Sequence, residues 1–302
     1  MNIVVGTRGS ALALSQTLLL VDELKKLHKN LIFEVRIIRT KGDLDQRTLL
    51  HKMNDKGIFV KEIEEQLIEG GIDLAVHSMK DMPSEMDERL DFPIISKRED
   101  PRDVLVLRSG LEKEALASCE ALRIGTGSKR RAFQLSRLYP HAQALPIRGN
   151  IDTRIRKITE EGLDGVVLAA AGLLRVGREA EIGKYFSQEE MLSAPCQGML
   201  ALQTRREDSF MREILQGIAD EEATIQYRAE RAFLEQTGGG CHLPIGAYCR
   251  VRKEGVELLG LLGTEDGRIL LRDRTEGRAE EAEKLGRELA CRLKNKLEGK
   301  DE

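Results

Sequence analysis

Two short segments of the chain carry side chains that could do chemistry. In the first, a predicted buried strand at residues 72–76 leads directly into His77-Ser78-Met79-Lys80-Asp81. Asp81 suits a general acid, a general base or a cation stabiliser, and Lys80 beside it favours an ionised carboxylate. A turn aspartate and a satisfied, half-buried histidine are the alternatives. The HxxKD spacing does not suit a metal site.

The second segment reads Gly-Gly-Gly-Cys-His at residues 238–242. Three glycines let the backbone approach another group closely or project a loop. Cys241 is therefore a candidate nucleophile or covalent attachment point, and a flexible hinge with an incidental thiol is the alternative. Adjacent Cys241 and His242 do not easily chelate one metal, and the chain has no CxxC partner for them, so we expect no metal.

Basic and hydroxyl side chains follow several predicted strands. Residues 6–10 read Gly-Thr-Arg-Gly-Ser, where free N–H groups at a helix start suit an anion, although the serine can equally be a simple helix cap. Residues 123–131 join a Gly-Thr-Gly-Ser loop to three consecutive cations. They are not a P-loop, because the glycine spacing is wrong and no Lys-Ser/Thr pair closes them. A solvated basic face is the alternative for this run.

Arginines also follow the next two strands of the same region. Arg148 and Arg154 flank one strand-to-helix turn, and Arg175 ends the run after the following strand. In open α/β sheets the ligand crevice lies at the carboxyl ends of the strands. Three successive strand ends that each present an arginine therefore predict a site for a small polyanionic ligand.

The elements that must position these residues alternate along the chain. The β-α-β rhythm predicts α/β domains, and it resets around residues 99–102. The first part shows strands at residues 3–5, 33–38 and 72–76 with helices at 10–27 and 61–68. The second part shows strands at residues 104–107, 144–147 and 166–170 with helices beginning near Lys129 and Ile151.

Residues 195–204 read as a further strand that returns to the first domain, which gives two crossovers. From about Asp220 the pattern becomes a charged helix at 221–236, strands at 245–251, 256–262 and 269–274, and a closing helix at 278–297. We therefore predict an α/β fold with a small α+β C-terminal domain. The predicted boundaries are 1–98 with 195–216 for domain 1, 99–194 for domain 2 and 217–302 for domain 3.

Composition limits the class of protein. Of 302 residues, 41% are hydrophobic and 33% charged, which is typical of a globular chain. A net charge of −3 and 4% aromatic residues argue against nucleic-acid binding through Lys129 to Arg131. No secretory signal or apolar run of spanning length is present. Five scattered cysteines do not read as a disulfide framework, so we expect a soluble, cytoplasmic protein with no membrane contact.

Taken together, these segments resemble the porphobilinogen deaminase (hydroxymethylbilane synthase) family, almost end to end. No single motif would suffice, but their order and separation are specific. The matching motifs are Thr-Arg-Gly-Ser at 7–10, Lys-Gly-Ile-Phe-Val-Lys-Glu at 56–62, Ala-Val-His-Ser-Met-Lys-Asp at 75–81, Arg-Glu-Asp-Pro-Arg-Asp at 98–103, Arg-Gly-Asn at 148–150 and Gly-Gly-Cys at 239–241.

The resemblance implies two lobes like those of type II periplasmic binding proteins, with a third domain that carries the cofactor. Cys241 matches the cysteine that holds a dipyrromethane cofactor through a thioether bond. The family joins four porphobilinogen molecules head to tail on that cofactor, with loss of ammonia, and hydrolysis then releases hydroxymethylbilane. The family also implies a monomer.

The resemblance further implies roles for individual residues. Asp81 matches the catalytic aspartate, and Lys56 lies in a loop motif thought to cover the cleft. The cofactor-binding positions are Lys80, Asp103, Thr126, Ser128, Arg130 and Arg131. The substrate-binding positions are Arg8, Ser10, Gln16, Lys56, Arg148, Arg154 and Arg175.

Some positions depart from the family pattern. Gly127 stands where serine is usual, and Asn54-Asp55 replaces a Gly-Gly pair. Cys196 lies in a segment that usually reads Val-Gly, and His242 follows Cys241 where Gln or Ser is more familiar. The rival interpretation is a non-catalytic binding protein of the same two-lobed fold, with Cys241 idle. The absence of a secretion signal and the additional third domain argue against it.

Overall fold

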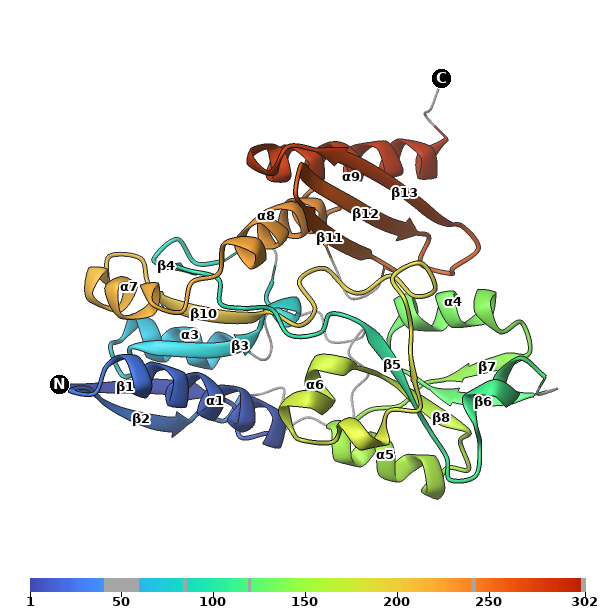
Figure 1. The fold of residues 1–302 in the computed structure, drawn as a ribbon, viewed down its shortest axis with the longest axis horizontal. Helices are drawn as coiled ribbons and strands as arrows, with labels where there is room; N and C mark the ends of the chain where they lie inside the picture. Colours follow the sequence, from blue (N-terminus) through green and yellow to red (C-terminus); the bar gives the residue numbers. More distant parts are fainter. Residues whose placement is uncertain (41–59, 84–85, 119–120, 240–242, 300–302) are drawn as a thin grey trace. The chain divides into compact units, whose positions relative to one another are not determined.

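The computed structural model describes residues 1–40, 60–83, 86–118, 121–239 and 243–299. The chain divides into two compact units (Figure 1). The first unit holds Met1–Glu99 and Met199–Thr224, and the second unit holds Asp100–Gly198 and Ile225–Glu302. The chain thus passes between the units at residues 99–100, 198–199 and 224–225.

A five-stranded sheet with the order β2-β1-β3-β10-β4 forms the centre of the first unit. Strands β2 and β3 run parallel to β1, while β10 runs antiparallel to β3 and β4. The predicted return of the chain to the first sheet is therefore confirmed, with β10 beginning later than the pattern indicated. The elements are β1 Asn2–Thr7, α1 Ala11–Leu27, β2 Ile32–Ile37, α3 Lys61–Ile68, β3 Leu74–Ser78, β4 Leu90–Asp91, β10 Leu200–Arg205 and α7 Ser209–Gln216.

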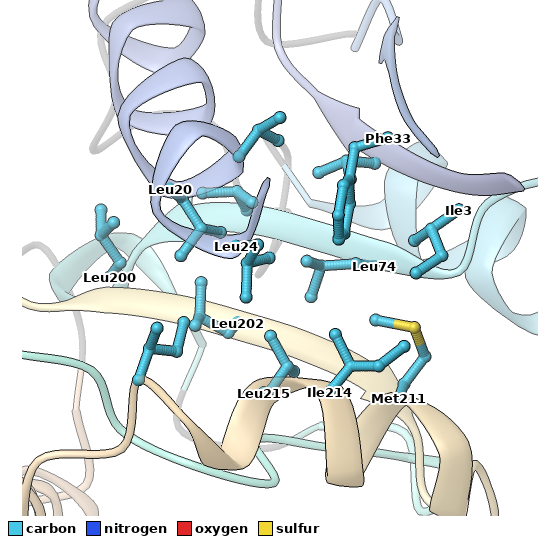
Figure 2. Packing of buried hydrophobic residues seen from close by; sticks show 14 of the residues in the cluster. Ile3, Leu20, Leu24, Phe33, Leu74, Leu200, Leu202, Met211, Ile214 and Leu215 are labelled. Atoms are coloured by element: carbon cyan, nitrogen blue, oxygen red, sulfur yellow. The ribbon is translucent and has the colours of Figure 1, made fainter. Parts of the chain in front are cut away.

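Strand alternation sets which helix covers which face of this sheet. Leu74 and Leu202 point towards α1 and α7, where they pack with Leu24 and Leu215 (Figure 2). Ala75, the next residue of β3 after Leu74, faces the other side of the sheet and belongs to the core that α3 covers. Successive side chains of a strand point to opposite faces, so the strand ends emerge between two buried apolar layers.

The second unit repeats this topology in a sheet of order β7-β6-β8-β5-β9. Strands β7 and β8 run parallel to β6, while β5 runs antiparallel to β8, as β10 does to β3. The elements are β5 Asp103–Leu107, β6 Leu122–Gly125, α4 Lys129–Leu138, β7 Ala142–Leu145, α5 Ile151–Glu160, β8 Gly165–Ala169, α6 Ala170–Arg175 and β9 Lys184–Tyr185.

A second, antiparallel sheet of order β11-β12-β13 forms the C-terminal part of the second unit. Helices α8 and α9 cover its apolar face through residues such as Phe233 and Leu289 (Figure 1). Gly260 permits this close approach, because a Cβ there would lie 2.7 Å from the Phe233 ring. The elements are α8 Glu221–Gln236, β11 Gly246–Arg252, β12 Gly255–Gly263, β13 Leu270–Gly277 and α9 Ala282–Glu298.

The predicted fold class is confirmed: two α/β lobes with five-stranded sheets and a small C-terminal α+β domain. The predicted helix at 221–236 matches α8 residue for residue. The residue boundaries of the three domains stay a prediction. Within the described residues, no helix is long and apolar enough to cross a membrane.

Candidate active site

The turn between β1 and α1 carries two of the predicted binding residues. Ser10 is the N-cap of α1, and its Oγ accepts a hydrogen bond from the Ala13 N–H at 3.3 Å. The capped turn expected as an alternative is therefore present. A serine hydroxyl also carries one donor hydrogen, so capping does not exhaust it. Arg8 lies half-buried two residues before the cap.

Gln16 joins the first turns of α1 to the end of β3. It is buried, and its side-chain amide donates to the Ser78 Oγ at 3.2 Å. Strands β1 and β3 are parallel neighbours, with Gly6 paired to Ala75. Their carboxyl ends therefore lie at one edge of the sheet, which brings the turn after β1 and the motif after β3 together.

The Met79–Asp81 segment forms a single 3₁₀ turn directly after β3. Buried Met79 anchors the turn, with its N–H donating to the Met199 carbonyl at 3.0 Å. Buried Met82 closes it through an N–H bond to the Met79 carbonyl at 3.1 Å. Lys80 is half-buried and Asp81 is exposed. The turn therefore holds the Asp81 carboxylate at the surface on a firmly anchored backbone.

His77 lies beneath this turn on β3, and it is buried rather than half-buried. Burial lowers its pKa to about 4, with the Arg8 charge acting in the same direction and the nearby Gln203 side chain opposing it. Among the described residues, His77 Nε2 has no hydrogen-bond partner. The imidazole is thus neutral near pH 7, which favours a structural role over proton transfer at that pH.

In the second unit, the arginine-bearing strand ends come together as predicted. Strand β6 lies between β7 and β8, and all three are parallel. The loop at 126–128, Arg148 and the short helix that ends at Arg175 follow these three strands. They therefore emerge at one edge of the sheet, where a ligand crevice is expected in an open α/β fold.

Arg130 and Arg131 at the start of α4 are buried, and both bind the buried Asp103. Arg130 Nη1 lies 2.6 Å from Asp103 Oδ2, and Arg131 Nη2 lies 2.8 Å from Oδ1. Burial alone would raise the pKa of Asp103, but the two guanidinium charges hold it below its ordinary value. Two cations and one carboxylate leave a local charge of +1. The alternative of a solvated basic face is therefore excluded for these two arginines.

The loop before α4 is tightly built. Ser128 is the N-cap of α4, accepting from the Arg131 N–H, and its own N–H donates to the Thr126 Oγ1 at 3.3 Å. A Cβ on Gly127 would lie 2.8 Å from the Ile147 carbonyl oxygen. This close approach explains why glycine stands here, since a serine would require the loop to move.

The turn after β7 carries Arg148, which is half-buried. Among the described residues, Arg148 Nη1 is buried with no hydrogen-bond partner. Asn150 caps α5 by accepting from the Thr153 N–H at 2.9 Å, and Arg154 Nε donates to the Gly149 carbonyl at 2.8 Å. Buried donors need acceptors, so a ligand carboxylate on Arg148 would satisfy this atom. The observed residues therefore fit a carboxylate-bearing cofactor such as dipyrromethane.

Several predicted positions lie outside the described residues, namely Cys241, Lys56, Asn54, Asp55 and His242. Cys196, by contrast, is described, and it has a φ of 59° where the family usually has glycine. Its N–H donates to the buried Glu230 at 2.6 Å. Only glycine enters this left-handed region without cost, which accounts for the usual family residue.

Sequence reasoning missed two buried side chains, Gln197 and Glu230. Gln197 contacts Asp103 and Arg131, and Glu230 binds the backbone N–H groups of Cys196 and Cys249. Glu230 lies on the apolar side of a predicted helix, which was the available signal for a buried carboxylate. Among the described residues, no group of three His, Cys, Asp or Glu side chains could hold a metal ion.

Comparison with known proteins agrees with these features. Residues 3–213 match the family model described as porphobilinogen deaminase, dipyromethane cofactor binding domain. Residues 224–295 match the porphobilinogen deaminase, C-terminal domain. The porphobilinogen deaminase of Clostridium novyi (strain NT) is 51% identical over 293 residues, which cover 96% of this chain and 97% of that protein. That of Clostridioides difficile (strain 630) is 47% identical, covering 96% of each chain.

Solved structures match this chain only at low identity and low TM-score. YhfZ from Shigella flexneri is 16% identical with a TM-score of 0.37, covering 80% of this chain and 98% of that one. The periplasmic aliphatic sulphonate binding protein SsuA from Escherichia coli is 10% identical with a TM-score of 0.39, covering 78% of this chain and 70% of that one. At TM-scores below 0.5 these likenesses say nothing about the chemistry of this chain.

Arginines at the strand ends of one α/β lobe, and an anchored aspartate at those of the other, are what we expect of an enzyme that acts on a polyanionic substrate. The chain belongs to the porphobilinogen deaminase family. It is accordingly a transferase of tetrapyrrole biosynthesis with a dipyrromethane cofactor. The resemblance, enzyme class and cofactor expected from the sequence are confirmed, while the individual residue roles stay predictions.

Proposed function

We propose that this chain joins four porphobilinogen molecules into hydroxymethylbilane, with Asp81 as the catalytic group. The observation that carries the proposal is the exposed Asp81 carboxylate on a turn whose neighbours Met79 and Met82 are buried. A positioned carboxylate is effective where positive charge develops in the transition state, because its orientation needs no rearrangement during the reaction. The anchored turn supplies that orientation.

The reaction gives Asp81 a defined task. When the carbon–nitrogen bond of the protonated aminomethyl group breaks, ammonia leaves with the bonding electron pair, and positive charge spreads from the methylene carbon onto the pyrrole ring. The carboxylate of Asp81 accepts a hydrogen bond from the pyrrole N–H and stabilises that charge. A new carbon–carbon bond then forms at the methylene carbon, and one proton is lost from the attacking pyrrole carbon.

Cations and neutral polar side chains are proposed to hold the acetate and propionate groups that each pyrrole brings. In the first unit these residues are Arg8, Ser10, Gln16, Lys56 and Lys80. In the second unit they are Asp103, Thr126, Ser128, Arg130, Arg131, Arg148, Arg154 and Arg175, with Asp103 acting through its arginines. A guanidinium binds a carboxylate through two parallel hydrogen bonds, which suits a chain whose negative charge grows with every condensation.

Cys241 is proposed as the thioether anchor of the dipyrromethane. When bound, the dipyrromethane supplies the pyrrole carbon to which the first substrate is joined. The buried Arg148 N–H that lacks an acceptor among the described residues supports this proposal from the side of the protein. We further propose a cytoplasmic monomer, since five scattered cysteines suit a reducing compartment.

The intact mass of the denatured protein tests the anchor. Wild-type chain from a haem-making host should exceed the sequence mass by two linked pyrroles, and Cys241→Ser should remove the excess. Cys291→Ser is the matched control, because Cys291 is an exposed cysteine on α9. A bare wild-type chain, or an excess that survives Cys241→Ser, would overturn the assignment.

A further inference from the structure

Gln197 occupies an unusual place beside the second passage of the chain between the units. It lies immediately before Gly198, the last residue of the second unit on this pass. Its side chain is fully buried. The side-chain Nε2 donates to the Pro101 carbonyl at 2.8 Å and to Asp103 Oδ1 at 2.9 Å, and its Oε1 accepts from Arg131 Nη2 at 3.5 Å.

The Pro101 bond ties the two passages together. The chain enters the second unit at Asp100 and leaves it at Gly198. Gln197 therefore links the segment just after the entry to the segment just before the exit, across 96 positions of sequence. The bond is partly buried, while the Gln197 side chain that donates it is fully buried. A buried amide that loses its acceptor costs free energy, so this bond helps to hold the two backbone segments together.

The Asp103 bond carries the same side chain into the arginine cluster. Asp103 Oδ1 accepts from Arg131 Nε at 3.0 Å, from Arg131 Nη2 at 2.8 Å and from the Gln197 amide. The next residue, Gly198, accepts from Arg175 Nη2 at 2.6 Å through its carbonyl. Arg131 and Arg175, two predicted ligand-binding arginines, are thus hydrogen-bonded to the consecutive residues Gln197 and Gly198, where the chain leaves the second unit.

Met199, the next residue, makes a similar contact within the first unit. Its carbonyl accepts from the N–H of Met79, the first residue of the turn that carries Lys80 and Asp81. Three consecutive residues therefore each contact a segment to which the proposed function gives a role. A connected series of hydrogen bonds of this kind fixes the orientation of the side chains that it joins, as well as adding stability.

We propose that Gln197 is a positioning residue for the reaction, which fixes Arg131 through Asp103 and holds the entry and exit segments of the second unit together. The proposal rests on the binding role given above to Arg131. The charged groups around the amide are Asp103 on β5 and Arg131 on α4, with Arg130 on the other oxygen of Asp103. A neutral amide is the side chain that can donate to the carboxylate and accept from the guanidinium at once.

Steady-state kinetics with porphobilinogen and amide hydrogen exchange test the proposal on the full chain. Gln197→Met keeps the length of the side chain but removes its three hydrogen bonds. It should raise KM by about 5- to 20-fold, the loss expected for buried hydrogen bonds, with kcat changed by less than about threefold. Gln197→Glu should raise KM further, because a second carboxylate competes for Arg131 and takes the local charge from +1 to 0.

Gln188→Met is the matched control. Gln188 is a buried glutamine of the same unit whose Oε1 accepts from the Ser193 N–H at 3.0 Å. It should leave KM within about twofold of wild type. Amide exchange at residues 100–103 should quicken at least about tenfold in Gln197→Met and stay unchanged in the control.

Equal KM values and equal exchange for the two methionine variants would overturn the inference. An inactive wild type would count against the proposed function instead. In that case the exchange measurement, which requires no turnover, still decides whether Gln197 holds the two segments.

Discussion

Arg131 binds Asp103 through two of its nitrogens, with Nε at 3.0 Å and Nη2 at 2.8 Å from the same carboxylate oxygen. The preceding Arg130 reaches the other oxygen at 2.6 Å. Consecutive residues of a helix point about 100° apart, yet both guanidinium groups are buried against the single Asp103 carboxylate. That carboxylate supplies the counter-charge that allows both arginines to be buried.

We expect Asp103→Asn to lower the free energy of unfolding by about 3–5 kcal/mol, because it leaves two buried guanidinium groups without a counter-charge. Asp100→Asn is the control, since Asp100 pairs with the exposed Arg102 and should cost less than about 1 kcal/mol. Urea unfolding at pH 7 measures both. Equal losses of unfolding free energy in the two variants would contradict the structural role of Asp103 and its two arginines.

The ion pairs of Asp103 with Arg130 and Arg131 also predict that the stability of the protein depends on pH. The pKa of Asp103 is lower in the folded protein than its unfolded value of about 3.9. The resulting stabilisation is fully present above about pH 4 and is lost as the pH falls below that value. Because asparagine does not titrate, the difference between wild type and Asp103→Asn should narrow below about pH 4 in the same unfolding series.

His77 predicts a second pH effect, in a different window. Burial lowers its pKa from 6.5 to about 4, so the unfolded chain binds a proton at a higher pH than the folded chain. Stability is therefore present above pH 6.5 and is lost as the pH falls towards 4. Between pH 6.5 and 5 the loss should be about 2 kcal/mol.

A His77→Gln variant should lack this slope, because glutamine does not titrate. Guanidinium unfolding at the two pH values measures the change. Identical pH dependence in the variant and the wild type would show that another group is responsible.

Local signals predicted much of this architecture. The N-cap residues Ser10, Ser128 and Asn150 each precede a helix that begins where the pattern indicated. Capping depends on side chains within three positions of the helix start, so sequence order contains it. The β-α-β rhythm likewise indicates parallel pairing, as found between β1 and its neighbours β2 and β3, and parallel pairing brings the strand ends to one edge.

Non-local contacts could not be predicted in the same way. Asp103 lies 27 positions from Arg130, and Gln197 lies 94 positions from Asp103. Nothing in the sequence near Arg130 indicates that a buried carboxylate neutralises it. The resemblance marked Asp103 as cofactor-binding, whereas the structure shows its carboxylate bound to arginines, because burial makes a counter-charge for them indispensable.

The turn after β7 offers a test of how backbone shape positions Arg148. Gly149 has a φ of 117°, and a Cβ there would lie 2.6 Å from Thr153 Cγ2. Gly149→Ala should cost about 1–3 kcal/mol of stability and raise KM for porphobilinogen several-fold. Gly110→Ala is the control, because Gly110 also has a positive φ but nothing within 4 Å. It should leave KM unchanged, and a raised KM there would sink the argument.

Cys196 and Cys249 allow the cost of the left-handed backbone to be measured. Both are buried and both N–H groups bind Glu230, but only Cys196 has a positive φ among the described non-glycine residues. Cys196→Gly relieves strain of about 1–2 kcal/mol while losing the thiol's packing. Cys249→Gly loses the packing without relieving any such strain, and the entropy cost of introducing glycine applies to both variants.

We therefore expect Cys249→Gly to destabilise the chain by at least about 1 kcal/mol more than Cys196→Gly, as measured by thermal or denaturant unfolding. Equal losses would show that the Cys196 backbone is not strained.

Asp81 is the residue on which the proposed chemistry depends most. Its side chain is exposed on an anchored turn, so Asp81→Asn and Asp81→Ala should change the free energy of unfolding by less than about 0.5 kcal/mol. Loss of a positioned charge at the reacting centre should lower kcat by about 10²- to 10³-fold. Asn keeps the shape but removes the charge, so the two variants should be similarly impaired.

Ammonia release from porphobilinogen measures this loss directly, because each condensation liberates one ammonia. Asp87→Asn is the control, since Asp87 is a surface aspartate of the same unit that pairs with Arg89. It should retain kcat within about twofold, as expected for a change away from the reacting centre. If Asp81→Asn retained similar turnover, charge stabilisation would have to come from another group, and the exposed position of Asp81 would reflect only an ordinary turn.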